Sequence, residues 1–533
     1  MVSSAPLWRI VRHKTMKENE NLDLSIFDIV GPVMIGPSSS GTAGMMRIGS
    51  AARLFLEEEP SFVEIVFHER NLSHYEGCCS HLALLSGLMG FATDDERVPD
   101  ALSEAGKRGL SFRISSFPKE ESPDMLRVKL LCKIVSGKEH AFTAVSTGGG
   151  SIRVESIEGF PVSVSNYVPH LFLTVGSSAS LEEMLSLQKT LRELTGEAFL
   201  LSRADGKALL YCPWNHDFSE DLKRKLETVP GISEVRFIPA FFEGGSAGTP
   251  PLFTEFSKLL SLCEKERCNI AEMMIRYEMK RSGRDREMIV NRMRGMWEIC
   301  KKAVREGLSG KYRPVFGLDD GRNAGRMLRA YEEGKTLGGS ILPKVSAYTL
   351  AVMEYAVSMG CIAATPTCGS AGVVPGCLCA LQEEYGFSDE EMVQSLFTMT
   401  ALGIVMAYDG VRFSGCAAGC QGEMTVSAAM AAMGIASLGK VSARQIGDAA
   451  AFTIKGLLGL VCDPVMGVEV PCIKRNVEAA AAALSAADMA IAGIESYLSL
   501  DEASLALKDV QDHLPEYLRG GGGGCAHVCA ARG

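Results

Sequence analysis

The sequence predicts a multi-domain protein with an α+β N-terminal domain, a ferredoxin-type β-α-β-β-α-β domain and an all-α C-terminal domain. Three observations support this prediction. First, 533 residues are too many for one hydrophobic core. Second, short strand-like runs dominate the N-terminal half, whereas the C-terminal half is rich in Ala, Met, Leu and Gly at helical spacing. Third, a Gly- and Pro-rich linker at 243–251 separates the two halves.

The N-terminal part begins with a polar segment, residues 1–23, which we expect to form a flexible arm. Residues 24–168 are expected to form the α+β domain, which opens with apolar runs interrupted by Gly-Pro. Helical spacing extends from Gly44 to Glu59. Strand-like runs follow at Phe62–His68, Ser111–Ser115, Met125–Cys132 and Ile152–Glu158.

A second module is expected at residues 169–242. It begins with a strand-like run at His170–Val175, followed by helical spacing over Leu181–Leu194. Two further strands flank Asp205-Gly206, which is a hairpin turn signal, and a polar helix and a last strand complete the module. This β-α-β-β-α-β order is that of the ferredoxin-like fold. The size of the module and the order of its elements resemble an ACT-type regulatory domain.

Residues 252–519 are expected to form a compact all-α catalytic domain. Val477–Leu498, for example, consists mostly of Ala and other small residues, and such helices pack closely on nearly every face. The longest apolar stretch, Leu396–Tyr408, is too short to cross a bilayer. Residues 520–533 form a Gly-rich tail that carries Cys525 and Cys529.

The overall composition narrows the class of function. A net charge of −10 argues against a nucleic-acid partner or an anionic membrane surface. No secretion signal is recognisable at the start, so we expect a cytoplasmic protein in a reducing environment. There, 17 cysteines are more readily explained as small core residues and metal ligands than as disulfides.

Three of these cysteines, Cys420, Cys462 and Cys472, lie in tight Gly or Pro settings. Glycines flank the first, Asp-Pro follows the second and Pro precedes the third, so all three are expected at chain breaks. Three thiolates would leave one corner of a cubane iron–sulfur cluster open, and an open iron can act as a Lewis acid on a substrate. The alternative is three buried structural cysteines. We favour metal ligation.

Two hydroxyl-rich loops are candidate substrate-binding elements. Gly36–Gly44 precedes a predicted helix, and its hydroxyls, backbone N–H groups and helix dipole suit a carboxylate. Ala364–Gly372 forms a similar bend between helices. For each loop the alternative is an ordinary helix start or break. The predicted substrate-binding residues are Ser38, Ser39, Ser40, Thr42, Thr367 and Ser370.

Together these features resemble the bacterial iron–sulfur-dependent L-serine dehydratases, with β and α portions fused in one chain. The resemblance is most specific at Thr365–Gly372, Gly419–Glu423 and Lys455–Asn476. It implies a [4Fe-4S] cluster on the three cysteines and conversion of serine to pyruvate and ammonia through an aminoacrylate. We also expect the protein to bind a small amino acid as its substrate and to form a homo-oligomer, with a dimer as the simplest case.

The chain departs from the family pattern where the acid–base residues are expected. Gly41 occupies the position of the family's presumed base histidine, and Cys78 occupies a second histidine position within Gly77–His81. His81, His74, His68 or Cys78 could therefore supply the base from a neighbouring position, and we name His81 and His74 as the candidate catalytic residues.

Alternatives stay open at this point. The substrate could be a related amino acid such as cysteine, or the chain could be a non-catalytic cluster-bearing sensor or scaffold. A pyridoxal enzyme is a third reading. Cys525 or Cys529 could also reach the open iron of the cluster.

Overall fold

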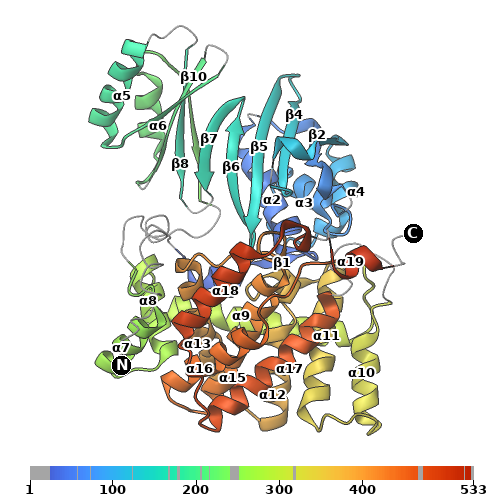
Figure 1. Cartoon of the computed structure of the whole chain (residues 1–533). Helices are drawn as coiled ribbons and strands as arrows, with labels where there is room; N and C mark the ends of the chain where they lie inside the picture. Colours follow the sequence, from blue (N-terminus) through green and yellow to red (C-terminus); the bar gives the residue numbers. More distant parts are fainter. Residues whose placement is uncertain are drawn as a thin grey trace, which may run out of the picture.

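The computed structural model describes residues 24–529, except 57, 73, 123, 166–167, 177–180, 205–206, 215, 241–250, 316–319, 466–471 and 521–522. Two sheet-containing units lie above a helical region, as Figure 1 shows. The predicted arm, nearly all of the predicted linker and the predicted Asp205-Gly206 turn lie outside the described residues.

The first unit is built on a six-stranded sheet with the order β3-β2-β4-β5-β6-β7. The pair β2 and β3 is parallel, and the other neighbouring pairs are antiparallel. Side chains alternate between buried and exposed along β7, because one face of the sheet is covered. The strands are β2 (Pro60–His68), β3 (Ser111–Phe117), β4 (Arg127–Ile134), β5 (Glu139–Gly148), β6 (Ser151–Ile157) and β7 (Phe160–Ser165).

Helices α2 (Met45–Phe55), α3 (Ser80–Leu88) and α4 (Ala101–Lys107) lie together on one side of this sheet (Figure 1). The four predicted strands and the helix after Gly44 are confirmed. The sequence prediction missed β5, β7, α3 and α4.

The second unit has the predicted β-α-β-β-α-β order. Its four strands form an antiparallel sheet with the order β11-β8-β10-β9, which is the ferredoxin-like arrangement. Its own apolar core includes Leu171, Leu173 and Leu191. The elements are β8 (His170–Val175), α5 (Leu181–Thr195), β9 (Leu200–Ala204), β10 (Lys207–Pro213), α6 (Glu220–Glu227) and β11 (Ile232–Ile238).

The helical region is built around α13 and α15, which are buried along most of their length. Small residues in both helices allow close approach; in α15, for example, a side chain on Gly434 would collide with Ser395 of α13. The helices are α7 (Phe256–Glu266), α8 (Ile270–Ser282), α9 (Arg286–Leu308), α10 (Asn323–Glu332), α11 (Ile341–Val357), α12 (Val373–Tyr385), α13 (Asp389–Tyr408), α14 (Gly415–Ala418), α15 (Met424–Leu438), α16 (Ala443–Gly456), α17 (Cys472–Ile491), α18 (Leu500–His513) and α19 (Cys525–Val528).

One detail corrects the all-α prediction for this region. A short strand, β12 (Cys361–Ala363), pairs antiparallel with β1 (Val33–Ile35) of the N-terminal part, with Met34 opposite Ile362. The preceding helix α1 (Ile26–Ile29) packs on α13. A three-residue strand has no detectable periodicity, and its partner lies about 330 residues away in the chain, so sequence patterns did not predict it.

Among the described residues, α13 is the one helix whose length and apolarity would suffice to cross a membrane. Most of it is buried inside the helical region, as expected for the core helix of a globular domain.

Candidate functional site

The three predicted metal-binding cysteines lie at chain breaks, as their Gly and Pro neighbours indicated. Cys420 begins a 3₁₀ turn, Cys462 lies in the loop after α16, and Cys472 is the first residue of α17. All three are buried. Cys462 lies close enough to Cys420 and Cys472 to interact with both electrostatically. The structure therefore brings together three thiols from segments up to 52 residues apart, since 472 − 420 = 52.

Burial keeps these thiols protonated in the absence of a cation. It raises the pKa of Cys420 to about 12, and burial with neighbouring thiols raises the pKa of Cys462 and Cys472 well above the ordinary value. Among the described residues, no three His, Cys, Asp or Glu side chains are close enough to hold a single metal ion.

Glu423 lies at the centre of these thiols, and the sequence prediction did not single it out. It accepts hydrogen bonds from the Thr367 hydroxyl and the Gly415 N–H group, and burial raises its pKa. The described thiols that interact electrostatically with this carboxylate are Cys78, Cys368, Cys416, Cys420, Cys462 and Cys472.

Two glycines make room for this carboxylate. A Cβ on Gly369 would lie 3.0 Å from Glu423 Oε1, and a Cβ on Gly415 would lie 2.8 Å from its Oε2. The only signal in the sequence is an acidic residue within the Gly-rich run that also contains Cys420.

The first hydroxyl-rich loop forms a π-helical turn, Ser39–Gly44, with Ser38 as its N-cap. Ser38 Oγ accepts a 2.9 Å hydrogen bond from the Gly41 N–H group and also bonds to the Cys78 thiol. Thr42 Oγ1 donates to the Cys78 carbonyl at 2.6 Å. Ser39 is buried, and Ser40 lies 3.4 Å from Ser38. These bonds hold the loop against Cys78. Ser40 is partly exposed, and its hydroxyl has only the long contact with Ser38.

The second hydroxyl-rich loop contains Thr367 and Ser370, whose hydroxyl oxygens lie 3.2 Å apart. Both residues are fully buried. Ser370 Oγ donates to the Thr365 carbonyl at 3.2 Å, and Thr367 reaches Glu423. The structure thus places this predicted loop directly against the buried carboxylate.

Hydrogen bonds connect the second loop to the first loop and to the cysteines. The Cys368 thiol donates to the Gly36 carbonyl at 3.2 Å. Asn476 Nδ2 donates to the Gly369 carbonyl at 2.8 Å and to the Cys472 carbonyl at 2.9 Å. Both predicted loops and the three cysteines therefore belong to one site.

The two predicted base histidines lie on the α3 side of this site. His81 is half-buried near the start of α3, its ring packs edge-on against Tyr75 at 5.3 Å, and burial lowers its pKa. Its other electrostatic neighbour is Glu76. His74 lies in the turn before α3. No described contact of His81 reaches Glu423 or the three cysteines, so a catalytic role for either histidine stays a prediction.

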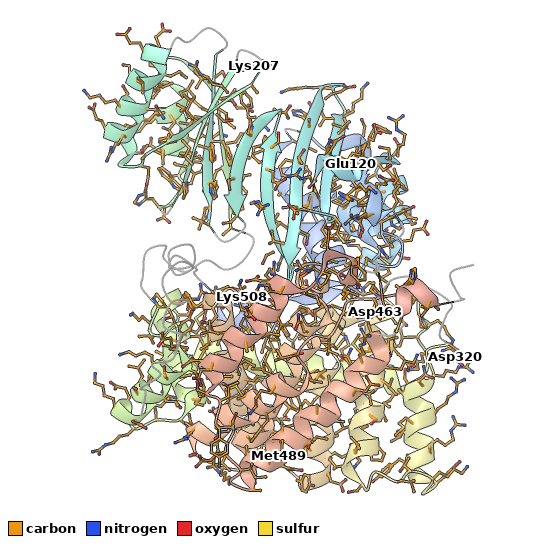
Figure 2. The ribbon with its side chains drawn as sticks, in the orientation of Figure 1. Glu120, Lys207, Asp320, Asp463, Met489 and Lys508 are labelled. Carbon is orange, nitrogen blue, oxygen red and sulfur yellow. The ribbon has the colours of Figure 1, made fainter. Side chains whose placement is uncertain are left out.

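The C-terminal tail reaches the same site through Asp463, the residue after Cys462. The Cys525 N–H group at the start of α19 donates to Asp463 Oδ2 at 2.7 Å. Arg475 donates to Asp463 Oδ1 at 2.5 Å and to the Val461 carbonyl at 2.9 Å, and it also bonds to the Cys420 thiol. Figure 2 labels Asp463 near the boundary between the sheet domain and the helical region.

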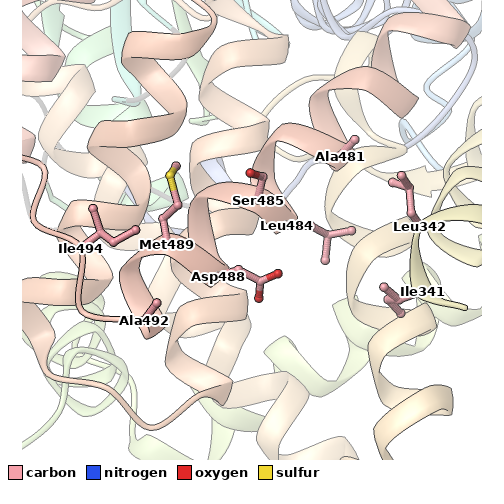
Figure 3. A pocket seen from close by; sticks show the side chains of 9 residues that line it. All are labelled: Ile341, Leu342, Ala481, Leu484, Ser485, Asp488, Met489, Ala492 and Ile494. Atoms are coloured by element: carbon pink, nitrogen blue, oxygen red, sulfur yellow. The ribbon is translucent and has the colours of Figure 1, made fainter. Parts of the chain in front are cut away.

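A hollow of about 490 Å³ lies elsewhere, between the start of α11 and the C-terminal half of α17 (Figure 3). It is mostly apolar, with the Asp488 carboxylate turned into it. It contains none of the predicted site residues. The lining residues are Ile341, Leu342, Ala481, Leu484, Ser485, Asp488, Met489, Ala492 and Ile494.

Comparison with known proteins agrees with this geometry. The serine dehydratase alpha chain family model matches residues 265–523, which include the three cysteines and the second hydroxyl-rich loop. The chain is 38% identical over 274 residues to the probable L-serine dehydratase, alpha chain, of Bacillus subtilis (strain 168), covering 90% of that protein and 51% of this chain. It is 31% identical over 263 residues to the L-serine dehydratase, alpha chain, of Peptoniphilus asaccharolyticus, covering 89% of that protein and 49% of this chain.

A beta-chain relative is also found. The chain is 35% identical over 150 residues to the probable L-serine dehydratase, beta chain, of Bacillus subtilis (strain 168), covering 67% of that protein and 28% of this chain. Similarity to separate alpha and beta chains is consistent with a fusion of both portions. The chain belongs to the L-serine dehydratase family.

Proposed function

We propose that this protein is an L-serine ammonia-lyase that converts L-serine to pyruvate and ammonia with a [4Fe-4S] cluster. The observation that carries the proposal is the convergence of three buried thiols and two hydroxyl-rich loops on Glu423. The alpha-chain and beta-chain relatives, named as L-serine dehydratases, support the same reaction.

The donor set fits the proposed cofactor. Cys420, Cys462 and Cys472 would hold the cluster, and their thiols are close together, buried and free of disulfides. A cluster held by three thiolates supplies a Lewis acid that polarises the substrate hydroxyl, which is otherwise a poor leaving group. The Arg475 guanidinium beside the Cys420 sulfur would stabilise the thiolate form of that ligand.

The hydroxyl-rich loops are proposed to bind the substrate. Ser38, Ser39, Ser40 and Thr42 would hold the substrate carboxylate, with Ser40 as the hydroxyl most available to it. Thr367 and Ser370 would act as secondary donors from the opposite wall. Because these loops are braced by internal hydrogen bonds, little reorganisation is needed when the substrate binds.

A base must also remove the proton on the substrate Cα atom. We propose His81 or His74 for this step. Burial lowers the pKa of His81, so its imidazole is neutral near pH 7 and able to accept a proton.

Location, assembly and regulation are proposed on sequence grounds. We propose a cytoplasmic protein, and its net charge of −10 argues against a nucleic-acid partner or an anionic membrane surface. We propose a homo-oligomer, in its simplest form a dimer. The ferredoxin-like unit at 169–242 is proposed to be an ACT-like module that senses an amino acid or joins subunits.

Two alternatives rest on the departures at Gly41 and Cys78. The first is the same type of lyase acting on a related amino acid such as cysteine. The second is a cluster-bearing sensor or scaffold without catalysis. A pyridoxal enzyme, the third reading, would require a bound aldehyde cofactor and no iron.

Anaerobic purification separates these functions. Iron and acid-labile sulfide are measured first, and pyruvate formation is then followed with serine, threonine and cysteine as substrates. A protein that contains the cluster and turns over serine supports the proposal, whereas a protein that turns over cysteine in preference to serine supports the first alternative. A protein that contains the cluster but turns over none of the three amino acids supports the sensor or scaffold. A colourless protein without labile sulfide rules the cluster out.

A further inference from the structure

Glu423 is an acidic side chain placed among sulfur atoms and hydroxyl groups. Its carboxylate receives hydrogen bonds from Thr367 and from the Gly415 backbone, and it faces the cysteine group. The residue is only partly buried. None of these neighbours is a cation.

A carboxylate in such surroundings normally has a cationic partner, because removing its charge from water costs several kcal/mol. In the described part of the chain, no ion pair joins Glu423 to a Lys, Arg or His side chain. The nearby Arg475 is paired with a different acid, Asp463, whose side chain is only 1% exposed. Among the described residues, Glu423 therefore lacks a positively charged partner.

An amino-acid substrate carries one cationic group. The proposed site already offers hydroxyl and backbone donors for the substrate carboxylate and a metal for its hydroxyl. Hydroxyl oxygens can also accept a hydrogen bond from an ammonium group, but only a carboxylate adds the opposite charge. Glu423 is an acceptor within reach of both loops. The Thr367 hydroxyl of the second loop donates to it, and Cys78, which is bonded to the first loop, interacts with it electrostatically.

We propose that Glu423 binds the α-ammonium group of the amino-acid substrate and thereby selects amino acids over hydroxy acids that lack it. This inference rests on the proposed function, since it assigns a role within the same site. The ammonium group supplies the missing counter-charge, and the fixed hydrogen bonds from Thr367 and Gly415 hold the carboxylate in place to receive it. Neutral molecules and anions of the same size gain nothing from this carboxylate.

The test compares two ligands that differ only in the amino group, L-serine and 3-hydroxypropanoate. For each, the dissociation constant is measured by thermal-shift titration on the cluster-loaded protein, and KM and kcat are measured for serine. In Glu423→Gln, which keeps the shape and removes the charge, serine binding should weaken about 10–100-fold. Binding of 3-hydroxypropanoate should change little or improve.

A second variant tests the same position without changing charge. Gly369→Ala places a methyl group 3.0 Å from Glu423 Oε1 and should displace the carboxylate, so it too should weaken serine more than 3-hydroxypropanoate. Glu298→Gln changes an exposed glutamate of α9 and should leave both constants unchanged. Iron content and melting temperature establish that each variant is folded and loaded.

The outcomes separate the two proposals. Equal weakening of both ligands, or a fall in kcat with unchanged serine binding, overturns the ammonium-binding role. If the unmodified protein forms no pyruvate from serine, the proposed function fails. The same two-ligand titration, repeated with the amino acid that does bind and its deaminated analogue, still tests Glu423.

Discussion

The side chain of Cys78 fills the space beside Gly41. A Cβ atom on residue 41 would lie 2.6 Å from Cys78 Cβ and 3.0 Å from Cys78 Sγ, distances that real Cβ atoms do not tolerate without movement. It would also lie 3.2 Å from Ser38 Oγ. The two departures from the family pattern are therefore one structural change, because a side chain at position 41 and Cys78 cannot occupy this space together.

Restoring a histidine at position 41 alone should fail. Gly41→His is expected to lower stability by about 1–3 kcal/mol through overpacking and to leave serine turnover no higher than in the unmodified protein. Gly41→His combined with Cys78→Gly should recover most of the lost stability, because the second change removes the colliding atoms. Thermal unfolding midpoints and pyruvate assays measure both effects.

Gly106→His is the matched control for this pair. Gly106 lies in α4, and a Cβ there would meet no atom within 4 Å, so histidine should be tolerated. An unfolding midpoint for Gly41→His equal to that of Gly106→His would show that Cys78 does not block the position.

Local chemistry in the sequence was enough to predict part of this molecule. Cys462 and Cys472 were expected at chain breaks because of their proline neighbours, and both lie there. The ferredoxin-like order was readable because each of its elements is a short periodic run between turn signals. These predictions depend on neighbours within a few residues of each other.

The features that the sequence did not predict depend on contacts between residues far apart in the chain. The β1–β12 pair joins residues about 330 positions apart, and the Cys368 thiol reaches Gly36 over a similar separation. Glu423 was missed for the same reason. Its position is set by two glycines and by Thr367, and the sequence does not show that these meet.

Each of the three predicted ligands should be needed for the metal cofactor. Cys420→Ser, Cys462→Ser and Cys472→Ser are each expected to lose most bound iron and acid-labile sulfide, because serine is a poor substitute for a thiolate ligand. Both quantities are assayed on protein purified without oxygen.

Cys268→Ser is the control for the ligand variants. Cys268 is a half-buried thiol in the loop between α7 and α8, outside the site, and its replacement should leave the cofactor intact. If any one of the three ligand variants bound as much iron and acid-labile sulfide as the unmodified protein, the cysteine replaced in that variant would not be a ligand.

The Arg475–Asp463 pair should stabilise both the cysteine site and the docked tail. Arg475→Met leaves the buried Asp463 carboxylate without its cation, and breaking such a pair typically costs about 3–5 kcal/mol. Adding Asp463→Asn removes the unpaired charge and should recover part of the loss. The coupling between the two substitutions is obtained from a double-mutant cycle of unfolding measurements.

Asp463 should also control the reactivity of Cys525 in the tail. Asp463 accepts hydrogen bonds from the Cys525 N–H group and thiol and raises the pKa of that thiol, so the single Asp463→Asn variant is expected to speed alkylation of Cys525. Mass spectrometry follows that reaction at each cysteine. Unchanged alkylation of Cys525, with Asp463→Asn folded, would contradict a docked tail.

The N-terminal helix α1 should make stability depend on pH. Asp28 accepts a 2.8 Å hydrogen bond from the Ser25 N–H group, and burial raises its pKa from 3.8 to about 7 against the opposing effects of that bond and of Arg281 and Arg47. Glu278 nearby raises it further. The folded protein thus holds this proton to a higher pH than the unfolded chain does. Folding takes up a proton between these two values, so the contribution of Asp28 to stability decreases as pH rises from about 4 to about 7.

Asp28→Asn removes this titration while keeping an oxygen that can cap the helix. As pH rises through this window, the unfolding midpoint of the unmodified protein should therefore fall relative to the midpoint of Asp28→Asn. The difference should be most in favour of the variant near pH 7. Parallel midpoint curves for the two proteins would place the Asp28 pKa near its ordinary value. Asp100→Asn, at the start of α4, where Asp100 makes no side-chain capping hydrogen bond, is the control for the loss of one carboxylate.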